Sequence, residues 1–167
     1  MGYNRAMIVL LYNIRSLHNV GSIFRTADAA GIKKLYLCGI TPAPVDVFGR
    51  PRQQLTKVSL GAEKYVEWDA SARSARAISN LIDKLKKEKY KILAVEQSKN
   101  SIPYNKLSKP YILNPKLCLI VGSEVKGLPK SILKKADKIL EIPMRGKKES
   151  LNVAVAFGIV AFYLAHG

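Results

Sequence analysis

Short apolar runs rich in β-branched and aromatic residues recur along most of the chain. They fall at residues 8–12, 34–38, 65–68, 91–95, 117–121 and 138–142. Helical patterns occupy several of the intervals between them. This alternation predicts an α/β fold, in which a mostly parallel sheet is covered by helices on both faces.

The first predicted helix carries its apolar residues on one side. Asn19 is a good N-cap and Gly31 is a good stop. At about 100° per residue, Arg25 falls opposite the apolar face, which consists of Val20, Ile23, Phe24 and Ala27. An isolated arginine in such a place is most often a solvated surface residue.

Two further helices are predicted before the last strand. An apolar face over residues 72–85 indicates the first of them, with Asp69 or Ser71 as its cap. Pro129 suits the first turn of a short helix that follows it.

The chain ends with a predicted helix over about residues 151–165, for which Ser150 is a good N-cap. This helix is apolar nearly all round, and a helix that is apolar on every side must be buried on every side. A second copy of the chain is the simplest way to cover the side of this helix that the sheet does not bury. We therefore expect a homodimer.

Residues 41–60 hold several prolines and basic residues and predict a long surface loop, which is usually functional or disordered. Residues 100–115 form a second stretch with Pro and Lys. No internal repeat, low-complexity tract or linker is present, so we expect residues 1–167 to form one domain.

The chain carries 28 Lys and Arg against 12 Asp and Glu, a formal net charge of +16. Charge does not select a fold, but it indicates a polyanionic partner, and nucleic acid is favoured over a membrane surface. The alternative is that the lysines are merely solvated.

Cys38 and Cys118 lie inside apolar runs, as small core residues do, and not in a disulfide framework or metal site. His18 and His166 have no ligand-like neighbours, so no metal is expected. The N-terminus lacks a signal-peptide pattern. The longest apolar stretch, at 153–165, is shorter than the length of about 20 residues that a helix needs to span a bilayer. We expect a cytoplasmic protein without membrane contact.

Three segments combine glycines and polar residues, at 19–31, 121–128 and 142–156. The fingerprints of Rossmann dinucleotide sites, P-loops and hydrolase elbows do not occur. In order and content, the three segments resemble the motifs of the SpoU/TrmH family of SPOUT RNA methyltransferases. The resemblance runs from residue 7 to the C-terminus, and the N-terminal RNA-binding extension of many family members is expected to be absent.

The resemblance implies the SPOUT fold with a trefoil knot near the C-terminus. It also implies S-adenosylmethionine as the cofactor and methylation of a ribose 2′-hydroxyl in tRNA or rRNA. Two alternatives stay open: a non-catalytic RNA-binding protein on the same scaffold, and a SPOUT enzyme that methylates a base nitrogen. Retention of Arg25, Glu124 and Asn152 favours the enzyme over the first alternative.

The catalytic residues that the resemblance implies are Arg25, Asn19, Glu124, Ser150 and Asn152. A guanidinium is a poor base, so the easier role for Arg25 is to hold an RNA phosphate and to stabilise a developing alkoxide. Whether Arg25 is also a general base stays open. So does the question of whether Glu124 touches cofactor, substrate or another subunit.

Cofactor contacts are expected mainly from backbone at the ends of the last two strands. The residues that the resemblance implies there are Gly122, Gly127, Ile142, Met144, Ser150, Leu151 and Val153. A weaker candidate is the end of the 91–95 strand, with Val95, Glu96 and Gln97.

RNA contacts are expected from basic residues in two loops. Arg50, Arg52 and Lys57 lie in the long loop at 41–60, and Arg145, Lys147 and Lys148 lie near the third motif.

Overall fold

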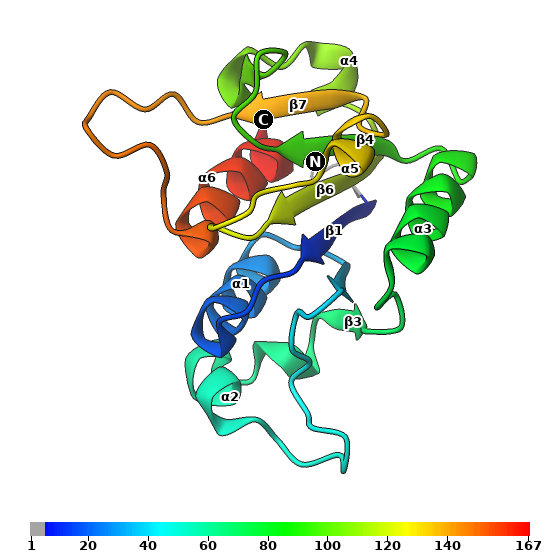
Figure 1. Cartoon of the computed structure of the whole chain (residues 1–167), viewed down its shortest axis with the longest axis vertical. Coiled ribbons are helices and arrows are strands. Elements are labelled where there is room, and N and C mark those ends of the chain that lie inside the picture. Colours follow the sequence, from blue (N-terminus) through cyan, green and yellow to red (C-terminus); the bar gives the residue numbers. More distant parts are fainter. Residues whose placement is uncertain (1–5) are drawn as a thin grey trace.

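Seven strands, parallel in every pairing, form one sheet (Figure 1). The structure is a computed structural model and describes residues 6–167. The spatial order is β3-β2-β1-β6-β4-β7-β5. The strands are β1 (Ala6–Tyr12), β2 (Lys34–Cys38), β3 (Glu67–Asp69), β4 (Lys91–Val95), β5 (Ile102–Pro103), β6 (Lys116–Gly122) and β7 (Lys138–Glu141). The predicted parallel α/β sheet is confirmed.

Helices cover both faces of this sheet. The α-helices of the described residues are α1 (Leu17–Ala29), α2 (Gln53–Ser59), α3 (Ala75–Lys87), α4 (Lys109–Ile112), α5 (Lys130–Leu133) and α6 (Val153–His166). Two short 3-10 helices join them, η1 (Ala62–Lys64) and η2 (Tyr104–Lys106). Buried residues of α1 and α6 belong to the core on one face, and those of α3 and α5 to the core on the other (Figure 1).

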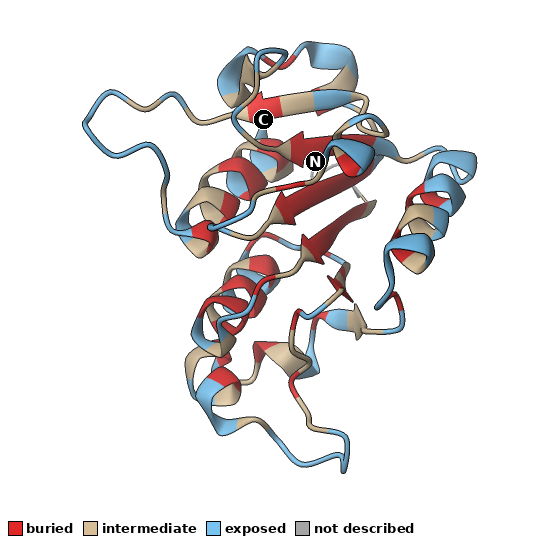
Figure 2. Cartoon of the chain, in the orientation of Figure 1, coloured by how far each residue is buried: buried red, intermediate tan, exposed pale blue. Residues whose placement is uncertain are grey.

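The central strands β1 and β6 are buried on both faces (Figure 2). Along β6, Leu117 and Leu119 pack into the core of α1 and α6, whereas Cys118 and Ile120 pack toward α3. This is the period of two that a strand imposes on its side chains. Phe24 and Phe157 are the largest fully buried side chains, and burial of each contributes roughly 1.5–3 kcal/mol. Cys38 and Cys118 are buried free thiols.

Helix α1 begins earlier than predicted. Its N-cap is Ser16, whose Oγ accepts a hydrogen bond from the backbone amide of Asn19 at 3.2 Å. Asn19 is therefore inside the first turn, and its side chain is left to reach other elements. The predicted stop is confirmed, because the helix ends at Ala29 and Gly31 follows with a φ of 70°.

The predicted caps of two other helices are also wrong. Ser74 caps α3, while Asp69 Oδ1 accepts a hydrogen bond from the Ser71 amide at 2.8 Å, outside the helix. Asn152, and not Ser150, caps α6. Each helix start offers several side chains suited to capping, and the sequence does not decide which backbone amides they meet.

The predicted irregular stretches contain short elements. The 41–60 loop includes α2, and the 100–115 stretch includes β5, η2 and α4. The predicted strand at 65–68 is β3, shifted to Glu67–Asp69.

Strand β7 follows β6 in the chain but is not its neighbour in the sheet, because β4 lies between them. The trefoil knot near the C-terminus stays a prediction. No helix among residues 6–167 is both long enough and apolar enough to cross a bilayer. The same residues contain no cluster of His, Cys, Asp and Glu that could hold a metal ion.

Candidate functional site

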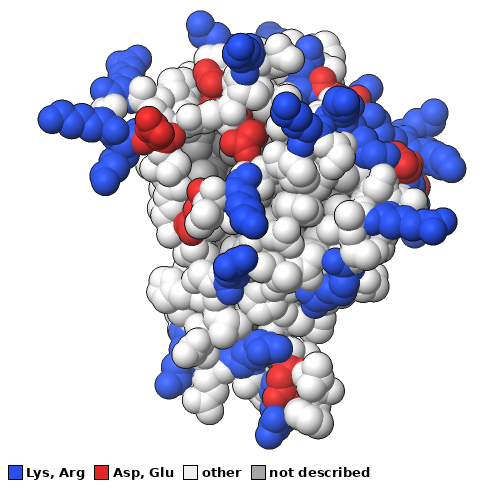
Figure 3. Space-filling view, in the orientation of Figure 1, with Lys and Arg blue, Asp and Glu red and all other residues white. Residues whose placement is uncertain are grey.

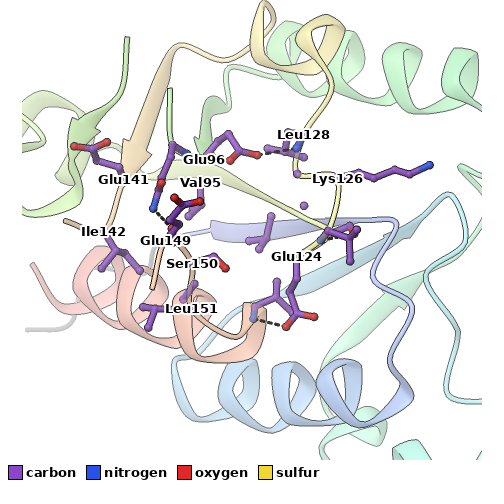
Figure 4. A pocket seen from close by; sticks show the side chains of 18 of the residues that line it. Val95, Glu96, Glu124, Lys126, Leu128, Glu141, Ile142, Glu149, Ser150 and Leu151 are labelled. Carbon is purple, nitrogen blue, oxygen red and sulfur yellow. Dashed lines mark hydrogen bonds between the residues drawn. The ribbon is translucent and has the colours of Figure 1, made fainter. Parts of the chain in front are cut away.

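The carboxyl ends of β4, β6 and β7 open into a cavity of about 640 Å³. The turn after β6 borders it on one side, and the segment from β7 to the start of α6 borders it on another (Figure 4). Ligands of open α/β sheets bind at this kind of edge. The lining residues are Val95, Glu96, Gln97, Val121, Gly122, Ser123, Glu124, Val125, Lys126, Gly127, Leu128, Lys130, Leu133, Glu141, Ile142, Met144, Glu149, Ser150, Leu151, Val153 and Ala156.

A tight turn after β6 forms part of the wall, and it depends on two glycines. A Cβ at Gly122 would lie 2.9 Å from the backbone carbon of Gly127 and 2.9 Å from the Leu128 side chain. Gly127 has a φ of 59°, and a Cβ there would collide with the carboxylate of Glu96. Any larger residue would therefore push the turn away from β4.

Glu96 links the end of β4 to this turn. Its Oε2 accepts a hydrogen bond from the Leu128 amide at 2.8 Å, and its Oε1 accepts one from the Gln97 amide at 3.0 Å (Figure 4). Gln97 in turn donates from Nε2 to the backbone carbonyl of Glu149 at 2.6 Å. Residues at the end of β4 thus bond both to the turn after β6 and to the segment between β7 and α6, which border two sides of the cavity.

A second set of hydrogen bonds joins the three predicted motifs. Glu124 Oε1 accepts from Asn19 Nδ2 at 3.2 Å and from the Val153 amide at 2.9 Å. Asn19 Oδ1 accepts from Asn152 Nδ2 at 3.1 Å. Asn152 also caps α6, since its Oδ1 accepts from the Ala154 amide at 2.9 Å. Asn19 is 8% exposed, so these bonds satisfy a buried amide.

The cavity is acidic although the chain is strongly basic. Its lining includes four glutamates, Glu96, Glu124, Glu141 and Glu149, and two lysines, Lys126 and Lys130. This local excess of carboxylates favours a ligand with positive charge.

The residues predicted to contact a cofactor come together. All of them line the cavity, including the weaker candidates Val95, Glu96 and Gln97. Of the predicted catalytic residues, Glu124 and Ser150 line it as well. Asn19 and Asn152 do not line the cavity. Asn19 donates a hydrogen bond to Glu124, which does line it, and Asn152 donates one to Asn19.

Arg25 is not among the lining residues of this cavity. It lies on the exposed side of α1, as its position opposite the apolar face predicted. The next residue, Thr26, faces α6, where its Cγ2 would lie 3.6 Å from a Cβ at Gly158. Arg25 is therefore the neighbour in sequence of a residue that contacts α6, and its own side chain is exposed outside the cavity.

The predicted RNA contacts lie in two separate places. Arg145, Lys147 and Lys148 are exposed on the loop between β7 and α6. The 41–60 loop forms the lower end of the molecule in Figure 1. Figure 3 shows Lys and Arg side chains over much of this face, including the lower end.

Several lining residues were not predicted from the sequence. They include Ser123 and Lys126 in the turn after β6, Glu141 at the end of β7, and Glu149 on the segment between β7 and α6. They lie at the ends of predicted strands or in the segments that follow them, a signal that applies to every residue of these regions. Glu141 is also held by Ser101, whose Oγ donates to its Oε2 at 2.7 Å.

The fold and the site define an α/β protein whose open parallel sheet has an acidic cavity at the carboxyl ends of its strands. The model of the SpoU rRNA Methylase family matches residues 6–162. The chain belongs to this family, as its motifs predicted.

Similar proteins include the tRNA (guanosine(18)-2′-O)-methyltransferase of Aquifex aeolicus, which is 30% identical over 161 residues, covering 93% of this chain and 67% of the relative. The crystal structure of an A. aeolicus TrmH/SpoU tRNA modifying enzyme has a TM-score of 0.78 at 28% identity, over 98% of this chain and 76% of that one.

An AdoMet-bound rRNA methyltransferase from Sinorhizobium meliloti has a TM-score of 0.78 at 25% identity, over 98% of this chain and 57% of that one. The chain spans between 56% and 67% of the length of several curated relatives that it matches.

Proposed function

We propose that this chain is an S-adenosylmethionine-dependent RNA methyltransferase that modifies a ribose 2′-hydroxyl in tRNA or rRNA. Family membership supports this proposal, as do the names of similar proteins that act on tRNA and rRNA. The chain would act in the cytoplasm as a single domain over residues 1–167, of which residues 1–5 lie outside the described part.

The observation that carries the proposal is the acidic cavity of a protein with a net charge of +16. S-adenosylmethionine bears a sulfonium and an ammonium group, and carboxylates are their natural counter-charges. The four lining glutamates supply them, while the turn at Gly122 and Gly127 keeps the backbone close to the cavity. A volume of about 640 Å³ is in the range of small-molecule sites.

The residues that would hold the cofactor are those at the three strand ends. Backbone at Gly122, Ile142, Met144 and Leu151 would contact it, and the link from Gln97 to Glu149 would keep the covering segment in place. When bound, S-adenosylmethionine supplies an electrophilic methyl group. The chain must then orient the ribose hydroxyl and stabilise the negative charge that develops on its oxygen.

Arg25 is the residue we propose for that charge. A fixed guanidinium near the oxygen, in a site sheltered from water, stabilises an alkoxide far more than bulk solvent does. Asn19, Glu124 and Asn152 would hold α1 and α6 in register beside the cavity, and Ser150 would help to orient the hydroxyl.

Because Arg25 lies outside the cavity of its own chain, we propose that it acts in a homodimer. Helix α6 buries Val153, Phe157, Val160, Ala161 and Leu164 within the chain. On its other side Val155 and Phe162 are 51% and 41% exposed. A second copy packed on this side would cover them. It would also bring the exposed Arg25 of one copy to the other copy's cavity, because α6, the helix that would carry the contact, lines that cavity at Val153 and Ala156.

The test is methyl transfer from S-adenosylmethionine carrying a tritiated methyl group to total RNA from cells that lack the gene, followed by digestion to nucleosides. We expect label in a 2′-O-methyl nucleoside. Label in a methylated base would identify the base-nitrogen alternative. RNA binding without transfer would identify the non-catalytic one.

A further inference from the structure

The most exposed apolar side chains of the described residues include two neighbours at the tip of the 41–60 loop. Val47 is 89% exposed and Phe48 is 77% exposed. Single exposed apolar residues are common, but two adjacent ones, one of them aromatic, form a contiguous apolar patch whose burial against a partner gains free energy. Residues 44–52, which carry both side chains, form a segment that we call the tip loop.

The tip loop is a compact hairpin. Val45 and Pro51 form an antiparallel bridge, and the Arg52 amide donates to the Pro44 carbonyl at 2.8 Å. Arg52 also donates from Nε to the Val45 carbonyl at 3.3 Å. The backbone that carries Phe48 is therefore held in place by hydrogen bonds within the tip loop.

Asp46 fixes the end of this hairpin. Its Oδ1 accepts from the amides of Phe48 and Arg50 at 2.9 Å each, and its Oδ2 accepts from Arg50 Nε at 2.9 Å. These hydrogen bonds hold the pKa of Asp46 below its ordinary value, and the bond from the Arg50 amide has the largest effect. Gly49, with a φ of 76°, closes the turn. The carboxylate is thus ionised and bonded at neutral pH.

Arg50 lies against Phe48, with its guanidinium carbon 4.9 Å from the ring centroid. The cation occupies one face of the ring and leaves the other face to solvent. The Arg50 side chain is itself 71% exposed, so it can still meet a phosphate. Lys57 on α2 is also exposed, and Figure 3 shows further cations at this end of the molecule.

We propose that Phe48 is a stacking platform for an unpaired base of the RNA substrate, with Arg50 behind the ring as an electrostatic contact to the RNA backbone. This inference rests on the proposed function, since it specifies how that substrate is held. Every base has a π-face, so an exposed aromatic ring binds unpaired bases with little regard to sequence. Inside a duplex the bases are already stacked, so it offers such a face only at its two ends.

A second copy of the chain is the other partner that an apolar tip could meet. The charges favour RNA, because the only acidic residue of the tip loop, Asp46, is bonded to Arg50, while Arg50 and Lys57 remain exposed. A second copy would bring its own positive charge of +16 to the same place.

The experiment compares Phe48→Ala, Phe48→Trp and Val47→Ala. Two labelled probes are titrated in fluorescence anisotropy, an oligoadenylate dodecamer and a blunt RNA duplex of the same length. We expect Phe48→Ala to weaken binding of the single strand by about tenfold, the scale of one base stack, and to leave the duplex nearly unchanged. Phe48→Trp should retain the wild-type affinity, and Val47→Ala, the matched control, should bind nearly as well as the wild type.

Three results would overturn the inference. If the wild type methylates RNA but Phe48→Ala binds the single strand equally well, stacking is refuted and the proposed function stands. If Phe48→Ala lowers the molar mass in light scattering, the tip loop contacts a second copy instead. If the wild type neither methylates total RNA nor binds either probe, the proposed function fails together with the inference.

Discussion

Asn19 and Glu124 are 105 residues apart in the chain, and a hydrogen bond of 3.2 Å joins Asn19 Nδ2 to Glu124 Oε1. The same carboxylate oxygen accepts the Val153 amide, so one atom connects α1, the turn after β6 and the first residue of α6. Asn152 completes the set through Asn19 Oδ1. Elements from both ends of the chain therefore meet beside the cavity.

Glu124→Ala should lower stability because it leaves the Asn19 amide and the Val153 backbone amide without their acceptor. An unsatisfied buried donor costs about 1–3 kcal/mol, which corresponds to a fall in melting temperature of roughly 3–10 °C for a chain of this size. Differential scanning fluorimetry measures it. Val125→Ala is the matched control, since Val125 is 89% exposed and its truncation should change the melting temperature little.

S-adenosylmethionine should bind to the wild type, and Gly127→Ala should weaken that binding. An alanine at a φ of 59° costs roughly 1–2 kcal/mol, and its Cβ would also displace Glu96. Titration calorimetry should show that the affinity falls by about tenfold or more. Gly146→Ala is the control, because a Cβ there meets no atom within 4 Å. Equal affinities for the two variants would place the cofactor elsewhere.

The apolar runs predicted the sheet because hydrophobic burial acts locally on each strand. The same pattern placed Arg25 on the exposed side of α1, because helical periodicity fixes direction without tertiary information. The motifs also predicted which strand ends line the cavity, because parallel strands bring these ends to one edge.

Other features depend on contacts that span the chain. Asn19 has the residue type of an N-cap, and only the fold shows that Ser16 caps the helix while Asn19 reaches Glu124. Strand β5 has two residues and exists because it pairs with β7, so no local pattern could predict it.

RNA binding should weaken steeply with salt, because phosphate contacts release counterions. The double variant Lys147→Glu, Lys148→Glu should bind RNA less tightly, and the slope of log affinity against log salt should fall by about one for each phosphate that a lysine no longer neutralises. A double reversal at Lys84 and Lys87 on α3 changes the net charge equally. If both double variants bind RNA equally weakly, the loop lysines act only through the net charge.

The buried thiols predict that stability falls in alkaline solution. Burial raises the pKa of Cys38 from 9.0 to about 12 and raises that of Cys118 as well. Between the unfolded and folded values the native state binds more protons than the unfolded state. The free energy of unfolding therefore falls as the pH rises through this window.

The test measures the free energy of unfolding by urea, near pH 8 and near pH 10.5. It compares the wild type with a double variant that carries both Cys38→Ala and Cys118→Ala. The wild type should lose more stability between the two conditions than the double variant does, by roughly 2 kcal/mol for each thiol. Equal losses would show that the thiols ionise as readily in the fold as in the unfolded chain.

The role proposed for Arg25 separates binding from turnover. Arg25→Ala should lower turnover by at least about a hundredfold while cofactor affinity stays nearly unchanged, because the guanidinium acts on the RNA and on the developing alkoxide and not on the cofactor. Single-turnover methylation and titration calorimetry on the same preparation measure both quantities. Full activity of this variant would refute the mechanism.

The linkage of the transferred methyl group decides between ribose and base methylation. RNA labelled by the wild type with tritiated methyl groups is hydrolysed in alkali and separated by size. A 2′-O-methyl group prevents attack on the adjacent phosphodiester, so we expect the label in an uncut dinucleotide. Label in mononucleotides that carry a methylated base would contradict ribose methylation.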